Sequence, residues 1–416
     1  MSSTKIHSLP AAPALPAALA SLDALVHSAQ DALVRDRSGA RKVGYLCNYT
    51  PIELLDAAGV LHARLFKGGD TARAAAGEFY TQSVFCDFTK SCIGAFEQGD
   101  PLYKAFDKVY SFHTCATMKR AAEVIELFTP TRLLNVPKLR KHDDSRRFFR
   151  EEVLSFRDDL AALTGNAPVS ADALSAAIRE RNALRRLLRQ ISELRRRALP
   201  PLSGRQFADI ARAYYYVPPA LLRPALEEIL AAAGATGGAG AAAAGATPIR
   251  LLAAGSIIAD GDRRILEIVE EELGARIVIE DNCAGARPFH SLVREDGDPF
   301  AALADGYLDQ SPCARQRPFE DALEFSARLA EQYAVEGVLY VFLKFCACYG
   351  VVQKQFIERF NAAGLPVLAL SSDYSESDRG QLLTRIEAFI EVLREKRLFA
   401  PPPAEPETAG TAANRI

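Results

Sequence analysis

The sequence predicts an α/β protein with two parallel-sheet domains and an all-helical segment between them. Three observations support this fold class. Residues 42–66 read as strand, helix and strand, and the same order returns from residue 249 onward. Between about 140 and 235 the apolar spacing becomes almost continuously helical. An Ala/Gly-rich stretch, residues 231–248, then separates the halves. Strand–helix–strand units joined by right-handed crossovers form parallel sheets, so two such runs predict two domains.

The composition fits this size and excludes some functions. The chain has 416 residues, of which 49% are hydrophobic, which is enough for several cores. A net charge of -2 gives no argument for general nucleic-acid binding. With no signal-peptide pattern and no apolar run of membrane-spanning length, we expect a cytoplasmic protein without membrane attachment. The expected segments are an N-terminal extension and helix (1–40), a first α/β domain (41–140), a helical insertion (141–235), an Ala/Gly linker (236–248), a second α/β domain with a C-terminal helix (249–400) and a disordered tail (401–416).

The first half contains a docking helix from about 19 to 34 and four expected strands. The helix that follows the first strand has Thr50 as a candidate N-cap and Pro51 at its first position. A second helix is expected within 84–98, and a third directly after Cys115. The expected strands are 43–47, 60–66, 108–112 and 132–136.

The second half repeats this scheme after the helical insertion. Its expected strands are 249–255, 275–281, 337–343 and 366–370, and its expected helices are 260–273, 351–362 and 375–396. The insertion contains one long helix that starts after Ser170 as N-cap and carries eight arginines between Arg179 and Arg197. Two interpretations of these arginines stay open: a solvated helix face, or a docking surface for an acidic partner or for phosphates.

Several cysteines follow the predicted strands. Without a secretion signal, the eight cysteines do not indicate a disulfide framework, and no C-x-x-C pair is present. Cys86 and Cys115 precede helices, where the helix dipole favours a thiolate, whereas Cys92 is expected to pack in the core. If the two domains face each other across a cleft, these two thiols lie on one wall and Cys346 lies on the other.

Three thiolates from separate loops suit an iron–sulfur cluster better than zinc, because structural zinc sites commonly use local C-x-x-C pairs. Two alternatives stay open at this point. The thiols can be ordinary buried residues, or Cys115 can be a nucleophile paired with His113. The sequence contains neither a P-loop nor a GxGxxG pattern, so no bound ATP or dinucleotide is expected.

The motifs also resemble a known family. The matching segments are GYLCNYTPIELLDAAGVLHARL (44–65), FCDFTKSCIGAFEQG (85–99), YSFHTCATMKR (110–120), GARIVIEDNCAGARPF (274–289), YLDQSPCARQRPFEDAL (307–323), LKFCACYG (343–350) and GLPVLALSSDYSESDRGQLLTRIEAFIEVL (364–393). On these segments the chain resembles the 2-hydroxyacyl-CoA dehydratases, a family that includes benzoyl-CoA reductase subunits and double-cubane-cluster proteins.

The resemblance implies two flavodoxin-like domains with a [4Fe–4S] cluster between them, and its ligands carry over to Cys86, Cys115 and Cys346. It also implies an acyl-CoA substrate, an ATP-hydrolysing activator iron–sulfur protein, and a homologous second subunit or a homodimer. Asn48, Tyr49 and Arg287 are the candidate pocket residues. A dehydratase would remove water through a ketyl radical started by one electron. A benzoyl-CoA reductase-type subunit, which reduces an aromatic ring, and a non-catalytic electron-transfer partner are the alternatives.

The sequence departs from the family pattern at three places. Ala116 stands where many members have Asp, and Cys348 is an additional thiol beside Cys346. The extra cysteines leave room for a double-cubane [8Fe–9S] cluster. However, Cys313 is single where the double-cubane proteins have a C-x-C pair, which favours the single cluster and leaves the larger one open.

Overall fold

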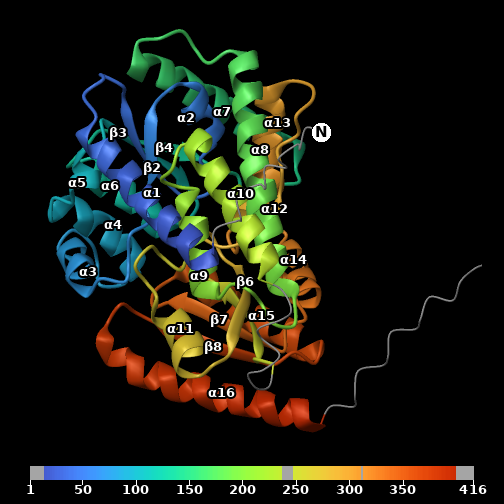
Figure 1. Ribbon diagram of the computed structural model, residues 1–416. Coiled ribbons are helices and arrows are strands. Elements are labelled where there is room, and N and C mark those ends of the chain that lie inside the picture. Colours follow the sequence, from blue (N-terminus) through green and yellow to red (C-terminus); the bar gives the residue numbers. More distant parts are fainter. Residues whose placement is uncertain (1–13, 237–246, 311–312, 400–416) are drawn as a thin grey trace, which may run out of the picture.

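The computed structural model describes residues 14–236, 247–310 and 313–399, and contains two four-stranded, all-parallel sheets. The strand orders are β2-β1-β3-β4 and β6-β5-β7-β8, so both sheets begin like the flavodoxin-type order 2-1-3-4-5. This confirms the predicted fold class. Figure 1 shows the sheets one above the other. The strands are β1 (Lys42–Leu46), β2 (Leu61–Arg64), β3 (Lys108–His113), β4 (Thr131–Asn135), β5 (Arg250–Gly255), β6 (Arg276–Asp281), β7 (Gly337–Leu343) and β8 (Val367–Ser372).

The central strands of each sheet are buried because helices cover both faces of a parallel sheet. Every residue of β1 and of β5 is buried. In the first sheet Tyr45 pairs with Arg64 on one side and with Tyr110 on the other. In the second sheet Ala254 of β5 lies opposite Tyr340 of β7. Strands β1 and β3, and equally β5 and β7, therefore flank the point where the strand order reverses, at which α/β sheets bind ligands.

The helices pack around these sheets and fill the space between them. In the first half and the insertion they are α1 (Leu15–Arg35), α2 (Ile52–Ala57), α3 (Thr71–Glu78), α4 (Asp87–Glu97), α5 (Pro101–Lys104), α6 (Ala116–Ile125), α7 (Asp143–Thr164), α8 (Ala171–Glu193), α9 (Gly204–Ala213) and α10 (Pro219–Ala235). In the second half they are α11 (Arg264–Glu267), α12 (Arg287–His290), α13 (Pro299–Asp309), α14 (Glu320–Gln332), α15 (Ala347–Ala362) and α16 (Arg379–Phe399). Among the described helices none combines the length and the apolar character needed to span a bilayer.

Some expected helix boundaries were wrong. Helix α2 begins at Ile52, and Thr50 does not cap it, because its hydroxyl donates to the Leu46 carbonyl over 2.9 Å. The helix expected from residue 260 begins at Arg264, because Gly261 has a φ of 105° in the preceding turn and Asp260 forms a β-bridge with Lys67. Helix α10 extends to residue 235, into the Ala/Gly run. Most of the linker prediction, the tail prediction and the first 13 residues lie outside the described ranges.

Three helices of eight or more residues, α3, α13 and α14, were not predicted. A start signal for α13 was present in the sequence. Asp298 accepts a hydrogen bond from the Phe300 amide, and Pro299 occupies the first helical position.

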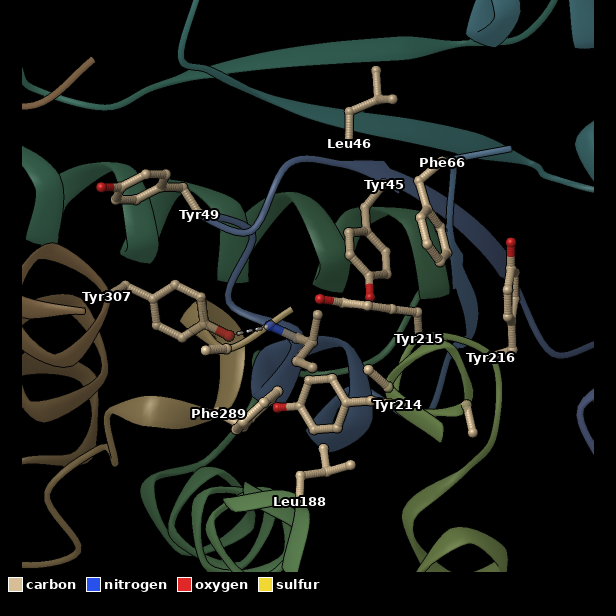
Figure 2. Packing of buried hydrophobic residues seen from close by; sticks show 14 of the residues in the cluster. Tyr45, Leu46, Tyr49, Phe66, Leu188, Tyr214, Tyr215, Tyr216, Phe289 and Tyr307 are labelled. Atoms are coloured by element: carbon tan, nitrogen blue, oxygen red, sulfur yellow. Dashed lines mark hydrogen bonds between the residues drawn. The ribbon is translucent and has the colours of Figure 1, made fainter. Parts of the chain in front are cut away.

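An aromatic core joins the two halves of the molecule (Figure 2). Tyr45 from β1, Tyr214 from the insertion and Phe289 from the second half belong to one buried cluster. At its edge the Tyr307 hydroxyl accepts a hydrogen bond from the Ile52 amide (3.1 Å) and donates to a carboxylate oxygen of Glu53 (2.7 Å). The relative position of the sheets is therefore fixed by close packing of large side chains.

The arginine-rich helix α8 contributes buried ion pairs to this junction. Arg181 binds Asp56 of α2, with its Nε and Nη2 atoms 2.5 and 2.8 Å from the carboxylate oxygens. Arg185 Nη2 lies 2.6 Å from Glu53 Oε1. All four of these side chains are largely buried. For Arg181 and Arg185, both interpretations of the sequence are therefore wrong, because the residues face carboxylates inside the protein and not solvent or a partner.

Arg195, in the turn after α8, makes a further pair of this kind in the other half. Its Nη1 and Nη2 atoms lie 2.6 and 2.9 Å from the two oxygens of Glu280 on β6. Arg179, Arg186 and Arg196 are exposed. The segment from α8 to Arg195 thus connects helix α2 of the first half to strand β6 of the second through buried ion pairs.

Candidate functional site

A cavity of about 440 Å³ lies where the carboxyl ends of both sheets face each other. The loops that follow β1, β3, β4, β5, β6 and β7 all contribute to its wall. Its volume falls within the range of about 300–1,000 Å³ that is usual for small-molecule sites. The strand topology alone explains its position, because loops after the central strands of both sheets meet at this edge.

The wall of this cavity contains seven of the eight cysteines. They are Cys47, Cys86, Cys115, Cys283, Cys313, Cys346 and Cys348. The exception is Cys92, which is fully buried in the core as predicted. None of the eight forms a disulfide. Such a concentration of free thiols at one edge points to binding of a thiophilic group.

The three predicted ligand cysteines share one structural position. Cys86, Cys115 and Cys346 are the N-cap residues of α4, α6 and α15, respectively. The Cys115 sulfur accepts a hydrogen bond from the Met118 amide over 3.4 Å. Free N–H groups and the positive end of the helix dipole favour a thiolate, or an anionic group bound to it, at each position. The structure therefore brings all three residues to one cavity, from both of its walls.

The environment of Cys115 differs from that of the other two thiols. Cys348 donates a hydrogen bond that lowers the pKa of Cys115; burial opposes this effect, and Thr117 supports it. Burial and the nearby Cys86 raise the pKa of Cys346 to about 12. The sulfur partners of Cys115 are Cys348, Thr117 and the Met118 amide, and His113 is not among them. The nucleophile interpretation with His113 therefore has no geometric support.

The three thiols line one cavity but do not form a site for a single metal ion. Within the described ranges, no three His, Cys, Asp or Glu side chains are close enough together to hold a single metal ion. A tetrahedral zinc ion, with Zn–S bonds of about 2.3 Å, would need the sulfurs roughly 3.8 Å apart. An iron–sulfur cluster binds each thiolate through a different iron, so its ligands are spaced more widely. The donor set of soft thiols is of the type that such clusters use.

The charges around the cavity also suit an anionic occupant. Among the described residues, its wall contains five cationic side chains and no Asp or Glu. Arg64, at the end of β2, is only 3% exposed, and its Nη1 donates to the Cys283 carbonyl over 2.8 Å. No described carboxylate lies within ion-pair distance of it, and its Nε has no partner among the described residues. A buried guanidinium is costly without a compensating charge, so this position favours thiolates or another anion. Sequence reasoning missed Arg64, although an arginine in a predicted buried strand is a usable signal.

The three predicted pocket residues all line the cavity, but they differ in whether their polar atoms already have hydrogen-bond partners. Asn48 Nδ2 donates to the Cys283 carbonyl over 2.7 Å, which ties the two walls together. Arg287 is held by Asp281, 2.7 Å from its Nε, and by a hydrogen bond to the Tyr349 hydroxyl. The buried hydroxyl of Tyr49 has no partner among the described residues. Tyr49 is thus the predicted residue best able to donate a hydrogen bond to a ligand.

A second set of thiols lies in the same cavity. Cys47, Cys283 and Cys313 come from three different loops. Cys47 has a φ of 72°, a conformation that is strained for a non-glycine residue and is common at functional sites. Burial raises the pKa of the Cys313 thiol to about 12, and the neighbouring Cys283 acts in the same direction. The sequence placed Cys47 and Cys283 at strand ends but did not group them with Cys313, because their proximity depends on how the two halves pack.

Comparison with known proteins identifies the family. The family model for the D-component of 2-hydroxyglutaryl-CoA dehydratase matches residues 47–393. A protein of Escherichia coli (strain K12) named as a candidate dehydratase subunit, YjiM, is 31% identical over 364 residues, which cover 85% of this chain and 92% of that protein. The (R)-phenyllactyl-CoA dehydratase beta subunit of Clostridium sporogenes is 21% identical, over 86% of this chain and 93% of that subunit.

A third relative carries a different activity in its name. This relative, one of the benzoyl-CoA reductase subunits of Thauera aromatica, is 26% identical over 75% of this chain and 80% of its own length. The family model begins directly after β1 and covers strands β2 to β8, and it includes every cysteine that lines the cavity. The chain therefore belongs to the 2-hydroxyglutaryl-CoA dehydratase D-component family, which the sequence motifs had indicated.

Proposed function

We propose that this chain is the iron–sulfur subunit of a 2-hydroxyacyl-CoA dehydratase-type enzyme. It would bind a [4Fe–4S] cluster through Cys86, Cys115 and Cys346 and remove water from a 2-hydroxyacyl-CoA. A single observation carries the proposal: three helix N-cap cysteines from the two halves of the chain line one cavity, and none of the described residues of its wall is a carboxylate. Family membership supports an enzyme subunit, and two of the relatives described above are named as subunits of a CoA-thioester dehydratase or reductase.

The residues of this chain have separable roles in the proposal. When bound, a cluster with one open iron supplies a Lewis acid and a route for a single electron to the thioester carbonyl. The helix N-termini at the three cysteines stabilise the negative charge of their thiolates. Tyr49 can donate a hydrogen bond into the cavity, and Arg64 balances negative charge at its base. Apolar contacts from Leu343 and Tyr374 shield Cys86 from water.

The proposed partners are those that the family resemblance implies. As the family resemblance implies, the electron would come from a separate ATP-hydrolysing activator protein that carries its own iron–sulfur cluster. A second, homologous subunit or a second copy of this chain would complete the enzyme. Cytoplasmic localisation belongs to the same proposal.

The first test is metal analysis of anaerobically purified protein. We expect about four irons and a similar amount of acid-labile sulfide per chain. Cys86→Ala, Cys115→Ala and Cys346→Ala should each lose most of the iron, whereas Cys92→Ala, the matched control in the core, should retain it. A cluster that survives Cys115→Ala would refute the ligand assignment. Absence of iron after reconstitution would refute the proposed function as a whole.

One observation favours a second candidate, a double-cubane [8Fe–9S] cluster. Cys47, Cys283 and Cys313 form a second set of three thiols in the cavity, so that six ligands are available without Cys348. About eight irons per chain would support this candidate. In that case Cys47→Ala and Cys283→Ala would lower the iron content. If the chain holds a single [4Fe–4S] cluster, both variants should keep about four irons.

Activity assays distinguish the remaining alternatives. With the activator and the second subunit present, turnover of 2-hydroxyacyl-CoA thioesters supports the dehydratase, and reduction of aromatic acyl-CoA supports a benzoyl-CoA reductase-type subunit. A chain that binds the cluster but shows no spectral change with either class of thioester would be an electron-transfer partner.

A further inference from the structure

Three cationic side chains form a rim on one side of the cavity. They are Lys138, Arg315 and Arg317, and we name this group the cationic rim. Lys138 and Arg317 are exposed and Arg315 is half-buried. No carboxylate of the described residues lies within 4.0 Å of any of the three, although ion pairs of this kind are frequent elsewhere in the protein. The described part of the protein therefore does not neutralise these three charges with a carboxylate.

The loops that carry the rim are fixed to each other. Lys138 lies in the loop after β4, and its carbonyl accepts a hydrogen bond from the Arg317 amide over 2.8 Å. Leu139 and Arg317 form an isolated parallel bridge. The Arg317 guanidinium is oriented by the carbonyls of Ala314 and Gln316, both at 3.0 Å. The cations are thus presented by a preorganised backbone, which lowers the entropy cost of binding a ligand.

Arg315 is the central member of the rim. Its amide donates to the Cys313 sulfur over 3.3 Å, which places the residue directly beside the thiol-lined floor. Its Nε atom is buried and has no partner among the described residues. An unsatisfied, buried donor on a permanently charged group is costly, so an acceptor supplied by a ligand would relieve this cost.

The three cations of the rim line the same cavity, and no carboxylate of the described residues pairs with them. This part of the wall therefore has a positive potential that is not cancelled locally. A potential of this sign attracts multiply charged anions.

We infer that the cationic rim is a subsite for the phosphate groups of a nucleotide-type ligand whose uncharged end enters the cavity. This inference rests on the proposed function, because in an acyl-CoA the charged phosphates and the reacting thioester are at opposite ends. The planar guanidinium of Arg315 can bind two phosphate oxygens together, and Lys138 adds a mobile point charge. The thiols and apolar side chains that line the rest of the cavity would then contact the acyl end of the ligand.

Binding measurements test this inference directly. The probes are coenzyme A, dephospho-CoA, pantetheine and inorganic pyrophosphate, titrated into the anaerobically purified protein at low salt. We expect coenzyme A to bind at least tenfold more tightly than pantetheine, and Arg315→Ala to weaken coenzyme A roughly tenfold while leaving pantetheine unchanged. Lys138→Glu, at an exposed position that does not threaten folding, should weaken coenzyme A and pyrophosphate by a similar factor. Arg223→Ala, on the exposed face of α10, is the matched control.

Each outcome bears on the inference. Equal affinity of the wild type for coenzyme A and pantetheine would overturn it, as would unchanged affinity in a Lys138→Glu/Arg315→Ala variant of normal iron content. Tight, rim-dependent binding of pyrophosphate with no preference for coenzyme A would overturn the link to a CoA ligand. A protein that binds coenzyme A through the rim but holds no iron would refute the proposed function and leave this inference standing.

Discussion

The buried pair of Arg195 and Glu280 gives a sharp prediction about what holds the helical insertion to the second sheet. Two nitrogens of Arg195 lie 2.6 and 2.9 Å from the two carboxylate oxygens of Glu280. The side chains are 0% and 4% exposed. Glu280→Gln keeps the shape but removes the charge, so Arg195 is left buried without compensation. Breaking such a pair by removing one partner costs about 3–5 kcal/mol, and we expect about 3 kcal/mol because the amide oxygen still accepts one hydrogen bond.

The measurement is urea unfolding of the full-length variant, followed by far-UV circular dichroism because the chain has no Trp. The matched control is Glu227→Gln in the exposed pair with Arg223, where the side chains are 52% and 50% exposed. That pair should contribute less than about 0.5 kcal/mol. The contrast between the two variants isolates burial, because both remove the same charge from the same type of ion pair.

A double-mutant cycle separates the ion pair from the packing around it. Arg195 also lies over the Phe207 ring, 3.8 Å from its centroid, so Arg195→Met loses part of this contact as well. The double variant Arg195→Met/Glu280→Leu leaves no unpaired charge. Its loss of stability should therefore be smaller, by roughly 3 kcal/mol, than the summed losses of the two single variants. A cost below about 1 kcal/mol for Glu280→Gln, or purely additive single changes, would refute the reasoning.

Two further predictions concern helix packing and pH. Gly94→Ala in α4 should destabilise the protein by about 1–3 kcal/mol in the same unfolding assay, because its new Cβ would lie 1.9 Å from the Arg73 carbonyl oxygen. Gly234→Ala in α10, where nothing lies within 4 Å, should be neutral or stabilising, and the opposite ranking would contradict the assigned packing of α3 on α4. For Asp56, burial alone would raise the carboxyl pKa, but Arg181 lowers it overall, so its contribution to stability is present above about pH 4 and is lost as the pH falls further. Asp56→Asn should therefore flatten the loss of stability below that pH, and an unchanged slope would exclude this carboxylate as its source.

The local sequence determined most of the secondary structure and the type of fold. Strand β7 was predicted with the same bounds that the structure shows. After Gly337, a short run of apolar and β-branched residues favours a buried strand. Likewise, a strand followed by Cys115 and an amphipathic helix placed that thiol at a helix N-terminus. The family followed from motifs in their order, which depends only on the sequence.

Tertiary structure decided which distant side chains meet and how charges are neutralised. Cys47, Cys283 and Cys313 became a set only when two sheets placed their carboxyl edges together. Local spacing cannot show this, because residues far apart in the sequence are brought into contact by packing alone. The arginines of α8 looked alike in the sequence, yet Arg181 is buried against a carboxylate and Arg186 is exposed. Neutralising a buried guanidinium requires a carboxylate from another element, and only the folded chain determines where that carboxylate lies.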